Sequence, residues 1–340
     1  MSERPRLVIL NPTSLDVLEA HRDHLDASGV TWIADPEFRS LRQDRVDQVL
    51  AGADALILPS SLRNLPLAEH MERHTALKVL SIAASGFDWL DVDAATRCGI
   101  VVTHAPVREG VEVVADMTWG LMLAVARQIP HHDRQLRLGR YDRGTGVSVW
   151  GKTLGIVGLG RIGRAVARRA AGFEMHVLAA EPKPDEGFVR EHDIELASLE
   201  DLLRRADFVS LHVRLDARTS GMIGARELAL MKASAYLINT AREGLVDGDA
   251  LTAAILGGGI AGAALDDPPA RSDSPLLGLP NVVFTPHMGN RAIEGMHAVF
   301  RCAIDNAVAV LDGRRPELVV NPEVYERPLR AARGRGRQAT

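Results

Sequence analysis

The sequence predicts an α/β fold with parallel sheets, and two features of its 340 residues lead to that prediction. Short apolar runs alternate with segments of helical periodicity along most of the chain, a pattern typical of parallel strands joined by crossover helices. Three glycines also stand between one apolar run and the helical segment that follows it. At this length two domains are expected, each large enough to bury its own core.

The N-terminal part of the chain contains several apolar runs that we expect to be strands. They are residues 6–11, 55–59, 78–83 and 100–104. Residues 15–28 between them have the spacing of a helix. Because no glycine fingerprint occurs in this part of the chain, we assign it to recognition of a substrate.

A long helix with few charges is predicted over residues 112–127, EVVADMTWGLMLAVAR. So much of its surface is apolar that it should be buried on several sides, either between domains or against a second subunit. The next segment, 131–144, is polar and strongly charged. Its neighbouring His131 and His132 would point to different faces of a helix, which favours a solvated surface over a metal site.

The three glycines follow the apolar run TLGIV and begin the stretch GLGRIG. Gly158 permits a tight turn from strand to helix, Gly160 lets the backbone approach a pyrophosphate, and Gly163 lets the helix pack closely on the strand. The helix that starts at Arg161 and Ile162 would present unpaired N–H groups to the phosphates. The pattern therefore predicts a dinucleotide site, and the alternative is a glycine-rich turn in an ordinary α/β sheet.

An acidic residue, Glu181, closes the apolar run HVLAAE that follows this helix. A carboxylate at that point accepts hydrogen bonds from ribose hydroxyls and repels a 2′-phosphate, so NAD (as NADH) is favoured over NADP. Lys183 weakens this preference without reversing it.

The alternation of strands and helices resumes after the fingerprint. Strands are expected at 194–197, 207–213, 236–240, 261–266 and 282–286, with helices at 198–206, 249–256 and 292–311. This supplies enough strands for a doubly wound sheet of about six. The basic, glycine-containing end of the chain, 328–340, is predicted to be a disordered tail.

Several segments of the chain, in order, resemble the D-isomer-specific 2-hydroxyacid dehydrogenase family, which includes D-lactate, hydroxypyruvate/glyoxylate and D-3-phosphoglycerate dehydrogenases. The matching segments are residues 151–164, 206–213, 230–251, 261–266 and 273–289, with weaker matches at 86–102 and 114–127. The resemblance implies two Rossmann-like domains with parallel sheets. The NAD domain, 102–291, would be inserted into a flavodoxin-like substrate domain formed by 1–101 and 292–327.

The resemblance also implies a homodimer, with the helix around 112–127 in its interface. It places the active site in the cleft at the carboxyl ends of the strands. Two charged residues in matching segments suit the reduction of a 2-oxo acid. Arg242, in NTAREGLVD, can pair with the substrate carboxylate and polarise the carbonyl, although a surface ion pair is the alternative. His287, in TPHMG, can donate and accept the proton near neutral pH, although a structural hydrogen bond is the alternative.

The third catalytic group is where the sequence departs from the family. Family members carry a Glu-Pro after the ALD strand, and that glutamate orients the catalytic histidine. Here the chain reads Ala-Leu-Asp266-Asp267-Pro268, a shortened loop without a glutamate. Asp267 is the nearest positional substitute, and Glu243, which replaces a glycine after the catalytic arginine, is the second candidate. Asp266 matches the family aspartate that contacts the nicotinamide amide.

Further positions are assigned from the resemblance alone. His212, Thr240 and Ala241 match positions that line the cofactor site. The substrate loop of the family corresponds to Ala84, Ser85 and Gly86, whose backbone amides could hold a carboxylate. Arg108 and Arg214 could supply charge for an anionic distal group of the substrate, and for each a solvated arginine is at least as good an interpretation.

The functional hypothesis is an NAD-dependent oxidoreductase that interconverts a D-2-hydroxy acid and its 2-oxo acid, acting mainly as a reductase. The alternative is an NAD(H)-sensing binding protein with vestigial catalysis, which the missing Glu-Pro makes worth testing. A formate- or phosphite-type oxidase is less favoured because its substrate loops differ.

Composition narrows the cellular setting. A net charge of −4 gives no reason to expect a nucleic acid or an anionic membrane as partner. The N-terminal residues lack the apolar core and cleavage site of a signal peptide, so a cytoplasmic protein is expected. With only Cys98 and Cys302, neither a disulfide framework nor a cysteine metal cluster is predicted, and no metal is expected at the active site.

Overall fold

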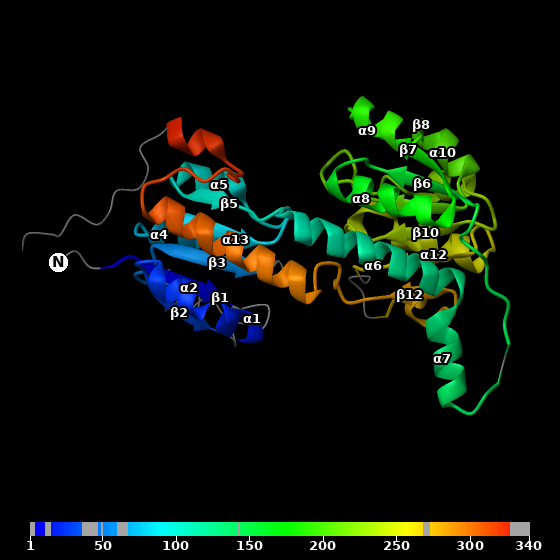
Figure 1. Ribbon diagram of the computed structural model, residues 1–340, viewed down its shortest axis with the longest axis horizontal. Helices are drawn as coiled ribbons and strands as arrows, with labels where there is room; N and C mark the ends of the chain where they lie inside the picture. The colour runs from blue at the N-terminus through cyan, green and yellow to red at the C-terminus, as the bar shows by residue number, and fades with distance from the viewer. Residues whose placement is uncertain are drawn as a thin grey trace, which may run out of the picture. The chain divides into compact units, whose positions relative to one another are not determined.

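The computed structural model describes residues 4–10, 15–35, 47–48, 50–59, 67–141, 143–267 and 273–326. The chain divides into two compact units. Unit 1 spans Met1–Gly110 and Ile293–Thr340, and unit 2 spans Val111–Ala292 (Figure 1). The tail expected at 328–340 and Pro268 lie outside the described residues.

Unit 1 is built on a parallel sheet whose five strands, among the described residues, run in the order β2-β1-β3-β4-β5. The strands are β1 (Arg6–Leu10), β2 (Thr31–Asp35), β3 (Ala55–Pro59), β4 (Val79–Ala83) and β5 (Val101–Thr103). All residues of β3 and β4 are buried, as their continuous apolar sequences predicted. This strand order is the flavodoxin-like one. The edge strand β2 was not predicted, because TWIAD is partly exposed and lacks a continuous apolar run.

Helices cover both faces of this sheet (Figure 1). They are α1 (Leu15–Ala20), α2 (Arg22–Ala27), α4 (Leu67–Arg73), α5 (Val92–Arg97) and α13 (Ile293–Leu311), with the short helix η4 (Pro322–Glu326). Alternate strand residues face opposite sides: Val8 and Leu56 pack with α4 and α5, whereas Leu7 and Ile57 pack with α13. The segment with helical spacing at 15–28 is two short helices separated by a turn at His21.

Unit 2 contains a parallel sheet with seven strands in the part of the chain that the structure describes, one more than predicted. In the order β12-β11-β10-β9-β6-β7-β8 they are β12 (Val282–Phe284), β11 (Gly262–Leu265), β10 (Tyr236–Asn239), β9 (Phe208–Leu211), β6 (Thr153–Val157), β7 (His176–Ala180) and β8 (Ile194–Leu196). Read from β8 to β11, this is the doubly wound order, with β12 added at one edge. Two parallel sheets in an α/β chain confirm the predicted fold class.

The helices of unit 2 also lie on both faces of its sheet. They are α6 (Arg108–Ala126), α7 (Ile129–Arg137), α8 (Arg161–Ala170), α9 (Glu186–Glu191), α10 (Leu199–Arg205), α11 (Ala225–Leu230) and α12 (Gly248–Leu256), with short helices η1 (Ala171–Phe173), η2 (Glu243–Leu245) and η3 (Pro275–Gly278). The predicted apolar helix is α6, and its Trp119 and Met122 are buried in the same cluster as α8 and the sheet. None of the helices within the described ranges is long and apolar enough to cross a membrane.

Candidate active site

The carboxyl ends of six neighbouring strands in unit 2 are in register. The strand residues aligned by the ladders are Ala180, Val157, Leu211, Asn239, Leu265 and Phe284. The site residues that the sequence predicted for this unit follow these positions closely in the chain. The structure therefore gathers them along one edge of the sheet, where ligands of doubly wound folds bind.

The glycine turn between β6 and α8 has the geometry that its sequence requires. Gly158 has φ of 94°, in the left-handed region, and a Cβ there would lie 2.9 Å from the carbonyl carbon of His212. A Cβ on Gly163 would overlap the carbonyl oxygen of Gly158, so the helix can approach the turn only without a side chain. A Cβ on Gly160, the N-cap of α8, would meet no atom within 4 Å. The space beside Gly160 and the first N–H groups of α8 fit a dinucleotide pyrophosphate.

Glu181 follows β7 and contacts this glycine turn. Its Oε2 accepts a hydrogen bond from the Leu159 N–H at 2.9 Å, and its Oε1 accepts one from the Lys183 N–H at 3.1 Å. These bonds hold the carboxylate beside the turn, where adenosine ribose hydroxyls would reach it. Arg161 and Ile162, the first residues of α8, lie at the same turn.

Two further predicted cofactor residues end the next strands. Burial lowers the pKa of His212 from its usual 6.5 to about 3, so the imidazole is neutral at physiological pH. Its Nε2 is 2.9 Å from the Ser210 hydroxyl. The hydroxyl of Thr240 bonds to that of Thr118 on α6 at 2.8 Å. Thr118 is fully buried and was not predicted, because a single threonine in an apolar helix gives no functional signal.

The turn that carries Arg242 is organised by the buried side chain of Asn239. Its Nδ2 donates to the Arg242 carbonyl at 2.7 Å, and its Oδ1 accepts from the Ala241 N–H at 3.0 Å. The Arg242 Nη1 donates to the Ala241 carbonyl at 2.8 Å. Asn239 is 2% exposed, and a buried amide needs hydrogen-bond partners for both its NH₂ group and its oxygen. Both groups are used to fix the backbone from which the Arg242 guanidinium extends. Sequence reasoning missed this residue, although a polar residue ending an apolar strand was a usable signal.

Asp266 anchors the loop that contains His287. Its Oδ1 accepts hydrogen bonds from the Thr285 hydroxyl at 2.5 Å and the Met288 N–H at 2.7 Å. Its Oδ2 accepts one from the Gly289 N–H at 2.7 Å. The carboxylate is 2% exposed and therefore grips the loop on both sides of the histidine. A carboxylate offers about four acceptor positions, so one remains for the nicotinamide amide that the sequence assigned to it.

The backbone of His287 is itself unusual. Its φ is 54°, and its N–H donates to the Thr285 carbonyl at 2.9 Å, which makes a tight turn. A non-glycine residue in the left-handed region costs on the order of 1 kcal/mol and persists only where neighbouring bonds impose it. Such strain is found often at functional sites, and here the bonds to Asp266 impose it.

Asp267 connects the Arg242 turn with His287. Its Oδ1 lies 3.4 Å from the His287 Nδ1, an ion-pair distance, and its Oδ2 accepts the Glu243 N–H at 3.2 Å. The side chain of Asp267 is 12% exposed and that of His287 is 29% exposed. Leu265 and Leu276 line a recess together with Asp267, so the Asp267 side of the pair has partly apolar surroundings. A cation, an imidazole and a carboxylate thus follow neighbouring strands at the same edge of the sheet.

The predicted substrate loop belongs to unit 1. Ala84 is buried, and its carbonyl accepts the Ala105 N–H at 2.9 Å. The Ser85 carbonyl lies 2.9 Å from the His104 Nδ1. These contacts tie the loop after β4, which includes Gly86, to the segment after β5. Arg108 and Arg214 are both exposed.

Comparison with known proteins places this geometry in context. Residues 119–289 match the family model described as D-isomer specific 2-hydroxyacid dehydrogenase, NAD binding domain. A glyoxylate reductase of Korarchaeum cryptofilum is 42% identical over 285 residues, which cover 80% of this chain and 84% of that protein. A D-3-phosphoglycerate dehydrogenase of Methanocaldococcus jannaschii is 39% identical over 297 residues, which are 85% of this chain and only 56% of that longer protein.

A solved structure is also similar to this chain. The crystal structure of a glyoxylate reductase from Paecilomyes thermophila superposes with a TM-score of 0.82 and 28% sequence identity. The match covers 95% of this chain and 99% of that one. These relatives are named as enzymes, and they give no support to a protein that only senses NAD(H).

Proposed function

The chain belongs to the D-isomer-specific 2-hydroxyacid dehydrogenase family and is an NAD-dependent oxidoreductase, and we propose that it acts chiefly as a reductase of small 2-oxo acids. The observation that carries this proposal is the pair of contacts made by Asp267, to the backbone beside Arg242 and to the His287 imidazole. These contacts hold a carboxylate-binding cation and a proton donor at one edge of the sheet that bears the glycine turn.

In the proposed reaction, the Arg242 guanidinium pairs with the substrate carboxylate and polarises the 2-oxo group. NADH, when bound beside the glycine turn, would supply the hydride for the carbonyl carbon. His287 donates a proton to the carbonyl oxygen, so that the 2-oxo acid, NADH and one proton become the 2-hydroxy acid and NAD⁺. Because Asp267 lies at Nδ1, the proton would come from Nε2 on the opposite side of the ring.

We assign the orienting role to Asp267 in preference to Glu243. The Asp267 carboxylate reaches the His287 ring, and its second oxygen is fixed by the Glu243 N–H. The aspartate is one methylene shorter than the glutamate of the family pattern, yet from its position directly after Asp266 it lies at ion-pair distance from His287.

For the substrate, we propose a compact 2-oxo acid such as glyoxylate or hydroxypyruvate. The support is the similarity to glyoxylate reductases over most of the chain. Unit 1 would bind the substrate, with Ala84, Ser85 and Gly86 offering backbone amides to its carboxylate, and unit 2 would bind the cofactor. The domain boundaries proposed from sequence assign substrate binding to 1–101 with 292–327 and cofactor binding to 102–291.

We further propose a cytoplasmic homodimer. A reducing compartment suits two cysteines that are unpaired in the structure, Cys98 and Cys302. A dimer interface is supported by large apolar side chains that are exposed on and after α7. They are Ile129, Leu136, Leu138, Tyr141 and Trp150. The interface would thus extend from α6, where the sequence placed it, into the next segment.

The proposal is tested with the purified full-length chain and a panel of 2-oxo acids, following the loss of NADH absorbance. Glyoxylate and hydroxypyruvate should be reduced, and larger or phosphorylated 2-oxo acids should react more slowly. His287→Asn should lower kcat by about 100-fold or more while NADH still binds, because only the proton donor is removed. Bound NADH without turnover of any acid in the panel would overturn the proposal.

A further inference from the structure

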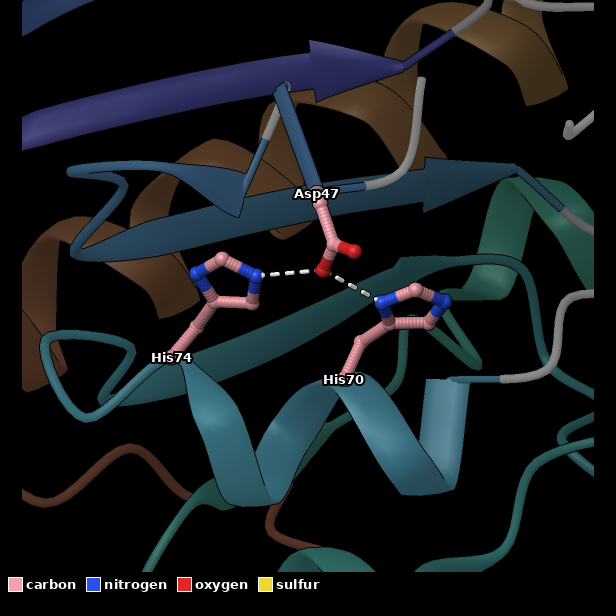
Figure 2. Close-up of side chains that lie close together, drawn as sticks. All are labelled: Asp47, His70 and His74. Atoms are coloured by element: carbon pink, nitrogen blue, oxygen red, sulfur yellow. Dashed lines mark hydrogen bonds and ion pairs between the residues drawn. The ribbon is translucent and has the colours of Figure 1, made fainter. Parts of the chain in front are cut away.

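A cluster of two histidines and one aspartate lies in unit 1, apart from the residues assigned to the reaction. His70 belongs to α4, and His74 follows one helical turn later, with its N–H donating to the His70 carbonyl at 3.0 Å. The four-residue spacing puts both imidazoles on one side of the helix. Their ring centroids are 6.5 Å apart and their planes differ by 23°. Figure 2 shows both rings turned toward a third side chain, that of Asp47.

Asp47 places a single oxygen between the two rings. Its Oδ1 lies 2.7 Å from the His70 Nδ1 and 2.7 Å from the His74 Nε2 (Figure 2). Hydrogen bonds from His74 and then His70 hold the pKa of the Asp47 carboxyl below its usual value, so the group is ionised. The carboxylate also lies 3.4 Å from the Arg73 Nη1. An anionic oxygen and two imidazole nitrogens therefore converge on one point.

The three side chains differ in how far they are exposed to solvent. The His70 side chain is fully buried, that of His74 is 18% exposed and that of Asp47 is 36% exposed. In the part of the chain that the structure describes, the buried Nε2 of His70 has no hydrogen-bond partner. An unpaired buried nitrogen usually costs free energy of folding. A histidine that served only to complete a hydrogen-bond network would therefore be poorly placed here. The Nδ1 contact is what the side chain gains there.

We propose that Asp47, His70 and His74 bind a divalent transition-metal ion, with Zn²⁺ as the best fit, and that water completes the coordination. Imidazole and carboxylate ligands suit Zn²⁺ and similar ions, whereas Mg²⁺ and Ca²⁺ prefer oxygen ligands alone. The three ligand atoms lie within 4.8 Å of one another. The partly exposed Asp47 side gives the ion and its water a route from solvent.

Binding would require the ligand atoms to move from their present positions. Zn²⁺ lies about 2.0–2.2 Å from nitrogen and oxygen ligands, so ligand atoms in a tetrahedral site are separated by about 3.3 Å. The Asp47 oxygen must therefore withdraw by about 0.6 Å from each ring. A partly exposed aspartate can do this by a side-chain rotation. The ring nitrogens of His70 and His74 lie within 4.8 Å of each other, and the partly exposed His74 ring can rotate to bring both within reach of one ion. The metal would replace the protons that the three groups now share.

The bound ion would fasten the segment before β3 to the end of α4. Asp47 lies in helical backbone of that segment, and its carbonyl accepts the Ala51 N–H at 2.9 Å. Next to His70, Met71 is fully buried in the core under α4. A cross-link there would stabilise the packing of α4 on the unit 1 sheet. The ion takes no part in hydride or proton transfer, so this inference is independent of the proposed reaction.

The test uses the full-length protein after removal of metal with EDTA, titrated with ZnCl₂ in a calorimeter and, separately, with CoCl₂ in a spectrophotometer. We expect one Zn²⁺ per chain, a visible absorption band typical of tetrahedral Co²⁺, and a rise of Tm by about 4 °C or more at saturation. MgCl₂ at the same concentration should give none of these changes.

Variants decide whether the cluster is the site. His74→Ala removes a partly exposed ligand and should weaken Zn²⁺ binding by about 100-fold and abolish the Co²⁺ band. His24→Ala is the matched control, because His24 forms a histidine–aspartate pair with Asp305 in the same unit but, within the described residues, belongs to no group of three side chains that could hold a metal ion. It should bind like the wild type, as should His287→Asn. Equal binding by wild type and His74→Ala, or no stoichiometric binding by a folded wild type, would overturn the proposal.

Discussion

Asp267 lies with its Oδ1 atom 3.4 Å from the Nδ1 atom of His287, and its other oxygen is fixed by the backbone of Glu243. The carboxylate is thus held beside the histidine by a bond to the turn that bears Arg242. The relationship makes the role of Asp267 testable against that of Glu243.

Asp267→Asn should lower kcat by about 10- to 100-fold with little change in the KM for NADH, because the imidazole loses its orienting charge while the glycine turn is intact. Glu243→Gln is the matched control and should retain activity within a few-fold, since its backbone N–H persists. Steady-state kinetics with the preferred 2-oxo acid measure both. A larger loss in Glu243→Gln than in Asp267→Asn would reverse the assignment.

Asp266→Asn should disturb the loop that carries His287. The amide supplies one acceptor oxygen where two now serve three donors, and its NH₂ faces backbone N–H groups. We expect a loss of about 1–3 kcal/mol in the free energy of unfolding together with lower kcat. Thr285→Val, which removes one of the three bonds, should have a smaller effect in the same direction. Urea unfolding and kinetics check this, and unchanged stability in Asp266→Asn would contradict the anchoring role.

Glu181→Gln should relax the preference for NADH. Removing the negative charge eliminates repulsion of a 2′-phosphate, so the KM for NADPH should fall by about tenfold while that for NADH rises modestly. The ratio of kcat/KM for the two cofactors is the measurement. Because an amide oxygen can still accept the Leu159 N–H, the turn should keep its shape, which the unchanged Tm of the variant would verify. An unaltered cofactor ratio would exclude Glu181 as the discriminating residue.

The partly buried His212, whose pKa is lowered by desolvation, should make stability fall in mild acid. Its pKa is about 3 in the folded protein and near 6.5 when exposed, so between these values the unfolded chain binds an extra proton. The stability associated with neutral His212 is therefore complete above pH 6.5 and is lost as the pH falls toward 3. His212→Gln keeps a polar side chain without titrating and should show a shallower decline of Tm from pH 7 to pH 5. Parallel curves for the two proteins would show that His212 does not titrate differently on folding.

The sequence predicted most strands of both sheets because parallel strands that are buried on two faces have continuous apolar sequences, as in ALILP and VLSIA. It did not predict β2, whose alternating exposure at a sheet edge leaves no such run. The break at His21 was also missed, because helical spacing continues on both sides of it.

The sequence pointed to many residues of the candidate site, though not to Thr118 or Asn239, and it did not predict the contacts among them. The glycine positions and the motif around Arg242 depend on local backbone geometry, and local geometry can be predicted from the residue types. The choice between Asp267 and Glu243 depends on how two loops from different strands approach each other, and no local pattern encodes that distance. The same reason explains why Asp47, His70 and His74 were not grouped: a helix spacing relates the histidines, but only tertiary packing brings the aspartate to them.

The long helix α13 completes the core of unit 1, where Val299, Phe300 and Ala303 cover the face formed by Leu7 and Ile57. Those side chains are synthesised only after the whole of unit 2. During translation, unit 2 can therefore finish folding on the ribosome while the earlier sheet still exposes an uncovered apolar face. The unit that is begun first is completed last, so a chain stopped before Ile293 would leave a folded second unit attached to an aggregation-prone first one.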